Sequence, residues 1–423
     1  MSKANDPQRR SWVPVPEGSD FPIQNLPFGV FTKGDDHKHI GVAIGEHILD
    51  ITVLSRGSDV LSDLGIPSSI FGVGILNPLL ALGRQKVSEL RDAISDLLEE
   101  GNPQLRDDAD VRKRVLVAQS EVKMTLPVKV GDYTDFYSSI EHATNVGTMF
   151  RDPNNALLPN WRHLPVGYHG RASSIVVSGT ETRRPKGQTK ADGEDPKYGP
   201  TRLLDFELEM AFVIGKGNDL GNPIAISDAE NHIAGMLLFN DWSARDIQKW
   251  EYVPLGPFLG KSFSSTASPW LVTLDALEPF RVQGPTQEPA VLDYLAPDGP
   301  QNYNIELEVY IQPEGQAPFR VSKSNFKYMY WSMCQQLAHH TVNGCNMSSG
   351  DMCASGTISG PTPDSYGSML EISWRGSKPV DMPDGSQRKF IQDGDTVIMK
   401  GYCEKDGVRI GFGECRSKVI PAL

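Results

Sequence analysis

One stretch of the chain, residues 205–210 (DFELEM), alternates strictly between acidic and apolar side chains. The apolar set is Phe206, Leu208 and Met210, and the acidic set is Asp205, Glu207 and Glu209. Successive side chains of a β-strand point to opposite faces, so this pattern predicts a strand with one apolar and one acidic face. Apolar residues at 203–204 and 211–214 indicate that the strand runs into a core.

The acidic face of this strand allows two interpretations. Three neighbouring carboxylates repel one another unless a cation or raised pKa values relieve the repulsion. The face therefore either binds a cation or is simply solvated, and the spacing by itself favours the solvated face. Because carboxylate oxygens are hard ligands, a bound cation would be Mg²⁺ or Ca²⁺ rather than zinc.

Composition excludes several classes of function. The chain has 423 residues and a formal net charge of −12, without a basic stripe interleaved with aromatics, which argues against nucleic-acid binding. The polar start (MSKANDPQRRSW) lacks the apolar segment of a secretory signal, and no run is long enough to span a membrane. Five cysteines, an odd number without CxxC spacing, indicate free thiols. We therefore expect a cytoplasmic protein.

The N-terminal third predicts a small β module followed by helices. Short strands bounded by turn residues are expected at 28–31, 40–44 and 47–51. A helical stripe covers residues 77–98 with Asn77 as its cap, and a charged helix is expected over 110–118. The pattern changes near 119–127, so we place a domain boundary there, between residues 1–122 and 123–423.

The remaining chain predicts many strands with few helices, so the fold class is mostly β with some α. One helix is expected from Ser227, which forms a capping box with Glu230, and others over 243–250 and 327–342. Residues 369–374 predict an apolar strand that carries one acid, Glu371. A buried Glu371 would need a partner such as a histidine, but the pattern alone favours a side chain that faces water.

A polar and aromatic run at residues 131–145 is a poor core segment and indicates a cleft lining. Within it, Asp135 is a candidate oxygen ligand, and the alternative is a local turn or helix cap. His142 is a candidate general base, although a single histidine is more often structural.

A second polar segment begins at Asn240 and continues into the helix expected over 243–250. If Ser243 caps this helix, Arg245, Gln248 and Tyr252 share one face close to Asp241. Such a face suits a carboxylate or an oxyanion held beside a cation, or equally a solvated stripe. Nearby, Lys261 lies in a segment that resembles a phosphate loop but has the wrong spacing, so nucleotide binding is rejected.

Eight phrases together resemble the fumarylacetoacetate hydrolase family, from about residue 26 to the C-terminus and most densely between residues 131 and 270. They are DYTDFYSS, HATNVG, LPVGYHGRASSIVVSG, LLDFELEMAF, NDWSARDIQ, WEYVPLGPFLGKSF, NGCNM and ASGTISG. The resemblance implies a small N-terminal SH3-like β-barrel, a larger C-terminal mixed β-sandwich roll and a homodimer.

The resemblance also implies a site for Mg²⁺ or Ca²⁺. Its ligands would be the acids Asp135, Glu207, Glu209 and Asp241. Lys261 and Ser265 stand where the family has further residues of the metal surroundings, although the family usually has threonine at the place of Ser265.

The implied reaction is hydrolysis of a carbon–carbon bond in a dicarboxylate β-diketone, which yields fumarate and acetoacetate at the end of tyrosine and phenylalanine catabolism. His142, oriented by Glu371, would activate water. Arg245, Gln248 and Lys261 would stabilise the oxyanion. The implied substrate contacts are Tyr137, Arg151, Tyr168, Tyr252 and Thr357.

Two alternatives remain at this stage. An acylpyruvate hydrolase, or an oxaloacetate decarboxylase or isomerase, would share the E-x-E strand and a distant acid. A non-catalytic metal-binding scaffold would bind the ion without turnover. The pairing of His142 with Glu371 favours hydrolysis, and the complete set of catalytic positions disfavours the scaffold.

Overall fold

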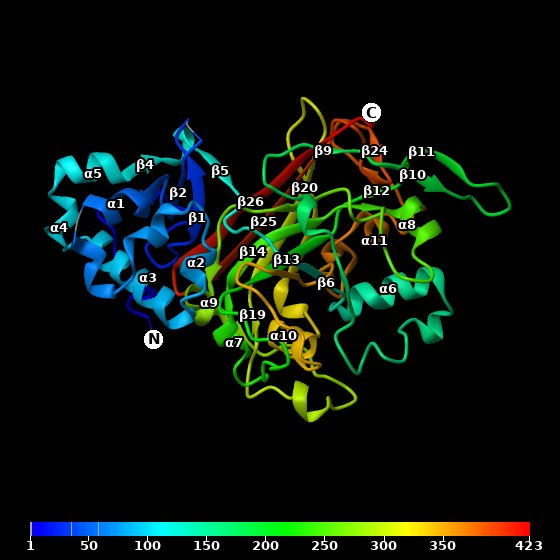
Figure 1. Cartoon of the computed structure of the whole chain (residues 1–423). Helices are drawn as coiled ribbons and strands as arrows, with labels where there is room; N and C mark the ends of the chain where they lie inside the picture. Colours follow the sequence, from blue (N-terminus) through cyan, green and yellow to red (C-terminus); the bar gives the residue numbers. More distant parts are fainter. Residues whose placement is uncertain (1, 35, 58) are drawn as a thin grey trace.

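Figure 1 shows the N-terminal sheet and its helices, in blue and cyan, beside a larger strand-rich body coloured from green to red. The computed structural model describes residues 2–34, 36–57 and 59–423. Strands and helices are mixed along the chain, so the α+β class expected from the sequence is confirmed. Within the described residues, no helix has both the length and the apolar character needed to cross a bilayer.

The N-terminal sheet is built on the predicted meander. Its antiparallel strands follow the order β4-β3-β2-β1-β5. Their bounds are β1 (Phe28–Thr32), β2 (Lys38–Ile44), β3 (His47–Asp50), β4 (Leu116–Ala118) and β5 (Lys123–Thr125). The helices of this region are α1 (Ile51–Gly57), α2 (Asn77–Leu80), α3 (Arg84–Leu98), α4 (Pro103–Arg106) and α5 (Ala109–Val115). The three predicted strands are confirmed.

The helical stripe over residues 77–98 forms two helices rather than one. Between α2 and α3 lies Gly83, whose φ of 91° suits glycine and would strain a side-chain-bearing residue. Asn77 does not cap α2, because its side-chain oxygen instead accepts the N–H of Lys129 at 2.8 Å. Its amide nitrogen donates to the carbonyls of Lys129 and Ser349, at 2.9 and 2.7 Å. The charged helix ends earlier than predicted, because residues 116–118 pair with β3 as β4.

The central sheet carries the stretch that opened the sequence analysis. Its strands follow the order β7-β6-β22-β13-β14-β16-β8, and β17 pairs with β14 outside this path. Their bounds are β6 (Tyr133–Phe136), β7 (Gly167–His169), β8 (Ile175–Val177), β13 (Leu208–Ile214), β14 (Ile233–Asp241), β16 (Ser265–Ala267), β17 (Val272–Thr273) and β22 (Met352–Ala354). Every residue of β13 and β14 is buried.

The alternation over residues 205–210 is correct, but the expected solvated face does not exist. Leu208 and Met210 pack into the core of the larger body. On the opposite face Glu209 is followed by Ala211 and Val213, which pack into a second core shared with the N-terminal sheet. The acids therefore lie at one end of a buried face. The strand is also interrupted, because Asp205 belongs to a separate short strand.

A second sheet, in the order β21-β20-β25-β26-β9, packs against the central sheet through β25 and β26. Its bounds are β9 (Thr182–Arg183), β20 (Glu306–Gln312), β21 (Phe319–Asn325), β25 (Thr396–Lys405) and β26 (Val408–Ile420). Four further pairs are β10 (Lys186–Thr189) with β11 (Lys197–Pro200), β12 (Leu204–Asp205) with β15 (Ser243–Ala244), β18 (Arg281–Val282) with β19 (Asn302–Tyr303), and β23 (Val380–Asp381) with β24 (Gln387–Arg388). The β10–β11 hairpin projects from the body at the right of Figure 1.

The remaining helices are α6 (Ile140–Phe150), α7 (Ala229–His232), α8 (Arg245–Glu251), α9 (Leu274–Leu277), α10 (Met333–Thr341) and α11 (Met369–Ile372). The predicted helices over 243–250 and 327–342 correspond to α8 and to the shorter α10. The helix expected from Ser227 forms only the single turn α7, which follows Asp228 without a side-chain cap, so the predicted capping box of Ser227 and Glu230 does not form. The apolar residues from Ile233 onward instead pair with β13 as β14. Ser243 does not cap α8, which follows Ala244.

The strand expected over residues 369–374 is also wrong. Residues 369–372 form the single turn α11, whose N-cap Ser368 accepts a hydrogen bond from the backbone N–H of Glu371. Periodicity does not separate a strand from a helix in so short an apolar run. The consequence is functional, because the turn buries Glu371 almost completely instead of exposing it.

Candidate metal centre and catalytic site

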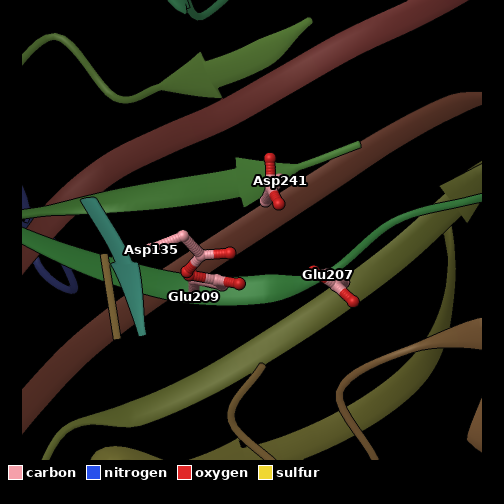
Figure 2. Close-up of side chains that lie close together, drawn as sticks. All are labelled: Asp135, Glu207, Glu209 and Asp241. Carbon is pink, nitrogen blue, oxygen red and sulfur yellow. The ribbon is translucent and has the colours of Figure 1, made fainter. Parts of the chain in front are cut away.

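Four carboxylates from three separate segments converge at one end of the central sheet (Figure 2). They belong to Asp135 on β6, Glu207 just before β13, Glu209 on β13 and Asp241 at the end of β14. Strand pairing accounts for this, because β22 pairs with both β6 and β13, and β13 pairs with β14. One oxygen from each residue lies within 4.8 Å of the others. The ligand set expected from the family resemblance is therefore assembled in space.

The surroundings of these carboxylates fit a hard cation. All four residues are at most 5% exposed. One oxygen of Asp135 (Oδ1) and one of Glu209 (Oε1) are buried without a hydrogen-bond partner among the described residues. A buried, unpaired carboxylate oxygen is costly, whereas Mg²⁺ and Ca²⁺ take several such oxygens as ligands.

The pKa values of three acids of the cluster are shifted in two opposite directions. Burial and the charge of neighbouring carboxylates raise the pKa values of Asp135 and Glu209 well above their usual range. Burial also opposes the ionised form of Glu207, but the positive charges of Lys261 and Arg245 outweigh it and lower the pKa of Glu207. Two buried cations do not neutralise the carboxylates that surround them, so an additional cation would relieve the repulsion.

Lys261 reaches the cluster from the segment that resembles a phosphate loop. Its ammonium group donates to a carboxylate oxygen of Glu207 and, at 2.5 Å, to Oδ2 of Asp241. Two hydroxyls contact the same Asp241: Oγ of Ser265 at 2.9 Å and the phenol of Tyr168 at 3.0 Å. Lys261 and Ser265 thus contact the cluster through its carboxylates.

Arg245, at the start of α8, borders the cluster on another side. Its Nη1 lies 2.8 Å from Oε1 of Glu207 and 3.4 Å from the side-chain oxygen of Gln248. Its Nε donates at 2.8 Å to Asp205, which the cluster of four does not include. Arg245 and Gln248 are neighbours as predicted, but the acids that Arg245 contacts are Glu207 and Asp205 rather than the predicted Asp241.

The imidazole of His142 and the carboxylate of Glu371 form a buried pair. Ser139 caps α6 and accepts the N–H of His142, which places the histidine in the first turn of the helix. Nδ1 of His142 lies 2.7 Å from Oε2 of Glu371. Burial opposes the charged form of Glu371, but the contact with His142 and other hydrogen bonds lowers its pKa. Glu207 forms an isolated β-bridge with Ser368, whose hydroxyl donates to Glu371 at 2.8 Å, so the pair lies beside the acidic cluster.

Family models cover almost the whole chain. The model described as "Fumarylacetoacetase N-terminal" matches residues 24–127, and "Fumarylacetoacetate (FAA) hydrolase C-terminal" matches residues 133–420. The chain belongs to the fumarylacetoacetate hydrolase family. The resemblance seen in the sequence phrases is thereby confirmed.

Relatives in this family match over nearly their full length. The fumarylacetoacetase of Homo sapiens is 57% identical over 418 residues, which is 98% of this chain and 99% of that protein. The fumarylacetoacetase of Caenorhabditis elegans is 58% identical with the same coverage. A solved fumarylacetoacetate hydrolase from psychrophilic Exiguobacterium antarcticum gives a TM-score of 0.51 at 18% identity, covering 94% of this chain and 99% of that one. The solved structure supports the fold alone.

The five expected substrate contacts of this family member are not equally close to the cluster. Tyr168 donates to Asp241. The ring of Tyr137 packs edge-on against the imidazole of His142, with the ring centroids 5.3 Å apart. Thr357 is buried beside Gly356, whose N–H donates to Glu209 at 3.0 Å. Arg151 uses its guanidinium to hold the carbonyl of Ala156.

Tyr252 is the outlying member of this group. It is 50% exposed and follows α8, at the beginning of a loop whose apolar side chains are also exposed. The same loop includes Val253, Leu255, Phe258 and Leu259.

Sequence analysis missed several residues that hold the family's catalytic pair in place. The carboxylate of Glu371 also accepts hydrogen bonds from Asn145 at 2.9 Å, Ser359 at 2.9 Å and Ser368 at 2.8 Å. Asn145 follows His142 by three positions, a spacing that puts both on one helical face. This spacing could have identified Asn145, whereas no sequence pattern connects the two serines to the pair.

Proposed function

We propose that this protein is a fumarylacetoacetase, which hydrolyses a carbon–carbon bond of 4-fumarylacetoacetate to give fumarate and acetoacetate in the final step of tyrosine and phenylalanine catabolism. The observation that carries the proposal is the buried His142–Glu371 pair beside the acidic cluster. The curated relatives with this activity in their name, at 57% and 58% identity, support it further.

His142 acts as the general base. With Nδ1–H donated to Glu371, Nε2 takes a proton from water, and the water oxygen bonds to the fumaryl carbonyl carbon. The adjacent carbon–carbon bond then breaks, and its electron pair passes to the acetoacetate fragment as an enolate. That enolate takes up the proton at carbon, which completes the hydrolysis. Glu371 keeps the imidazole in the required tautomer and stabilises its positive charge.

The enolate is an acceptable leaving group only if its oxygen is held by positive charge and hydrogen-bond donors. Arg245, Gln248 and Lys261 supply this charge and these donors. A dication held by the cluster would add positive charge to the site. We assign Mg²⁺ or Ca²⁺ to Asp135, Glu207, Glu209 and Asp241, with Lys261 and Ser265 orienting the carboxylates.

Substrate binding is assigned to residues around the catalytic pair. The proposed contacts are Tyr137, Arg151, Tyr168, Tyr252 and Thr357. Tyr137 lies against His142 and Tyr168 against Asp241, which supports their assignment as substrate contacts. For Arg151 and Tyr252 the support is the family resemblance, and ordering of the exposed Tyr252 loop around the substrate would bring that residue into contact.

We propose two domains, at residues 1–122 and 123–423, assembled in a cytoplasmic homodimer. The consecutive pairing of five antiparallel strands supports an SH3-like barrel for the first domain. The two packed sheets of residues 123–423 support a β-sandwich roll for the second. Sedimentation velocity at micromolar concentration tests the dimer, and a monomeric mass would contradict it.

The decisive assay follows the loss of absorbance of fumarylacetoacetate with and without a chelator. We expect turnover to fumarate and acetoacetate, loss of activity with the chelator and recovery with Mg²⁺ or Ca²⁺. Cleavage of acylpyruvate or decarboxylation of oxaloacetate in place of this reaction would favour the same-family alternatives. Binding of the ion without turnover of any of these compounds would indicate a non-catalytic scaffold.

A further inference from the structure

Asp205 is a buried acid to which the proposed mechanism gives no part. It opens the acidic stretch at residues 205–210, yet it is 0% exposed and lies outside the cluster of four carboxylates. Both of its oxygens are engaged. Oδ1 accepts the N–H of Met369 at 2.7 Å, and Oδ2 accepts the N–H of Leu370 at 3.0 Å and Nε of Arg245 at 2.8 Å. The backbone of α11 therefore fixes the carboxylate that meets Arg245.

The guanidinium of Arg245 is held at two of its three nitrogens. Asp205 takes Nε, and Glu207 takes Nη1 at 2.8 Å. The third nitrogen, Nη2, is buried without a hydrogen-bond partner among the described residues. An unpaired buried donor is costly, so its presence indicates that a ligand atom satisfies it.

A guanidinium is planar, so two fixed nitrogens also fix the position of the third. A donor held in place before the reaction stabilises developing negative charge without the cost of reorientation. Glu207 alone would leave the group free to pivot about the Nη1 contact. Asp205 removes that freedom, because it anchors the opposite side of the plane.

We propose that Asp205 is a positioning residue that holds Arg245 so that Nη2 donates to the substrate oxygen that becomes the enolate. The inference rests on the proposed function and deepens it, since it assigns the donor atom and the residue that aims it. Asp205 acts through Arg245 and is not a metal ligand.

The test is a double-mutant cycle in the full-length, metal-loaded enzyme. Asp205→Asn should lower kcat by roughly 10- to 100-fold with a smaller change in KM, and Arg245→Met should lower kcat by about 100- to 1,000-fold. In the Arg245→Met background, Asp205→Asn should change kcat by less than about threefold. A full additional loss in the double variant, or wild-type kcat for Asp205→Asn, would overturn the proposal.

Asp395 offers a matched control for the loss of a buried ion pair. It is 1% exposed and holds Nε and Nη2 of Arg388 at 2.8 and 2.9 Å, and it also accepts the N–H of Gln392. Asp395→Asn removes the same kind of contact as Asp205→Asn, so it should lower the melting temperature while kcat stays at the wild-type value. A fall in kcat equal to that of Asp205→Asn would show a general effect of destabilisation and overturn the proposal.

A second readout needs no turnover. Acetoacetate carries the oxygen assigned to Nη2, so its calorimetric affinity should fall in Asp205→Asn and in Arg245→Met, while Mg²⁺ affinity stays within about twofold of wild type. If the wild type does not cleave fumarylacetoacetate, the proposed function fails, and acetoacetate binding still tests the link between the two residues. Should Asp205→Asn not fold, Asp205→Glu keeps the charge but displaces the carboxylate, and the same cycle applies. Unchanged acetoacetate affinity in either Asp205 variant would overturn the proposal.

Discussion

Nδ1 of His142 lies 2.7 Å from a carboxylate oxygen of Glu371, although 229 positions separate the two residues. The carboxylate does not depend on the histidine for its place, because Asn145, Ser359 and Ser368 also donate to it. Glu371 is thus held from several sides and in turn fixes the imidazole. This arrangement leaves Nε2 as the basic atom.

Replacing the base should abolish turnover without loss of the metal ion. We expect His142→Ala to lower kcat at least about 100-fold, the usual contribution of a positioned general base, which corresponds to about 2.7 kcal/mol. Mg²⁺ affinity, measured by calorimetry, should stay at the wild-type value. His232→Ala, which removes a histidine bonded to the carbonyl of Lys216, is the control and should retain full activity. Substantial turnover by His142→Ala would remove this residue from the mechanism.

Glu371→Gln should impair the general base His142 while leaving metal binding intact. The amide of glutamine presents either an N–H or a neutral oxygen to Nδ1, so it no longer stabilises a charged imidazole. We expect kcat to fall by about 100-fold or more, with KM and metal affinity little changed. Steady-state kinetics together with calorimetry checks this expectation, and wild-type kcat in the variant would show that the pair is structural.

Glu207→Gln should lose the ion and the activity together. Glu207 contributes an oxygen to the cluster and also holds Lys261 and Arg245, so its charge has two roles there. We expect Mg²⁺ affinity to fall at least about 10-fold, the lower end of the effect of losing a supporting contact in a metal site. Glu308→Gln is a matched control, because Glu308 is buried and paired with Arg320 away from the cluster. An inactive variant with normal metal affinity would contradict the ligand role.

The effect of a chelator on stability should depend on pH. Burial and nearby carboxylates raise the pKa values of Asp135 and Glu209. A pKa raised by folding adds stability below the unfolded-state pKa, and this stability is lost as pH rises through the folded-state pKa. A dication takes over from the proton as counter-charge, so EDTA should lower the melting temperature more at about pH 8 than at about pH 5.5. Differential scanning fluorimetry checks this, and an EDTA effect independent of pH would contradict it.

The sequence predicted which residues belong to the candidate site better than it predicted which of them contact one another. The family resemblance identified Asp135, Glu207, Glu209 and Asp241, because the matching sequence phrases contain the family's ligand positions and their sequence neighbours. The roles of Asp205 and Asn145 were missed. Asp205 contacts Arg245 on another element, and no local pattern records that contact. The three-residue spacing between His142 and Asn145 does indicate a shared helical face, but the partner of Asn145, Glu371, is 226 positions away.

The errors in the fold have one physical cause. The helix predicted from Ser227 is reduced to one turn without a side-chain cap, because pairing of the apolar residues from Ile233 with β13 outweighs the helical pattern. Conversely, the apolar run around Glu371 forms a helical turn because Ser368 caps it and Asp205 accepts its first N–H groups. Propensities of a few tenths of a kcal/mol per residue yield to such tertiary contacts.

The sequence by itself determined the family, the α+β class and the alternation of the acidic strand, since all three depend on residue identity and local spacing. Only the tertiary structure decided that both faces of this strand are buried, and that its first acid anchors Arg245 while the other two join Asp135 and Asp241. The reason is that burial and pairing depend on which segments meet in space. Whether a carboxylate is a candidate metal ligand or holds an arginine in place depends on which charged side chains pack against it.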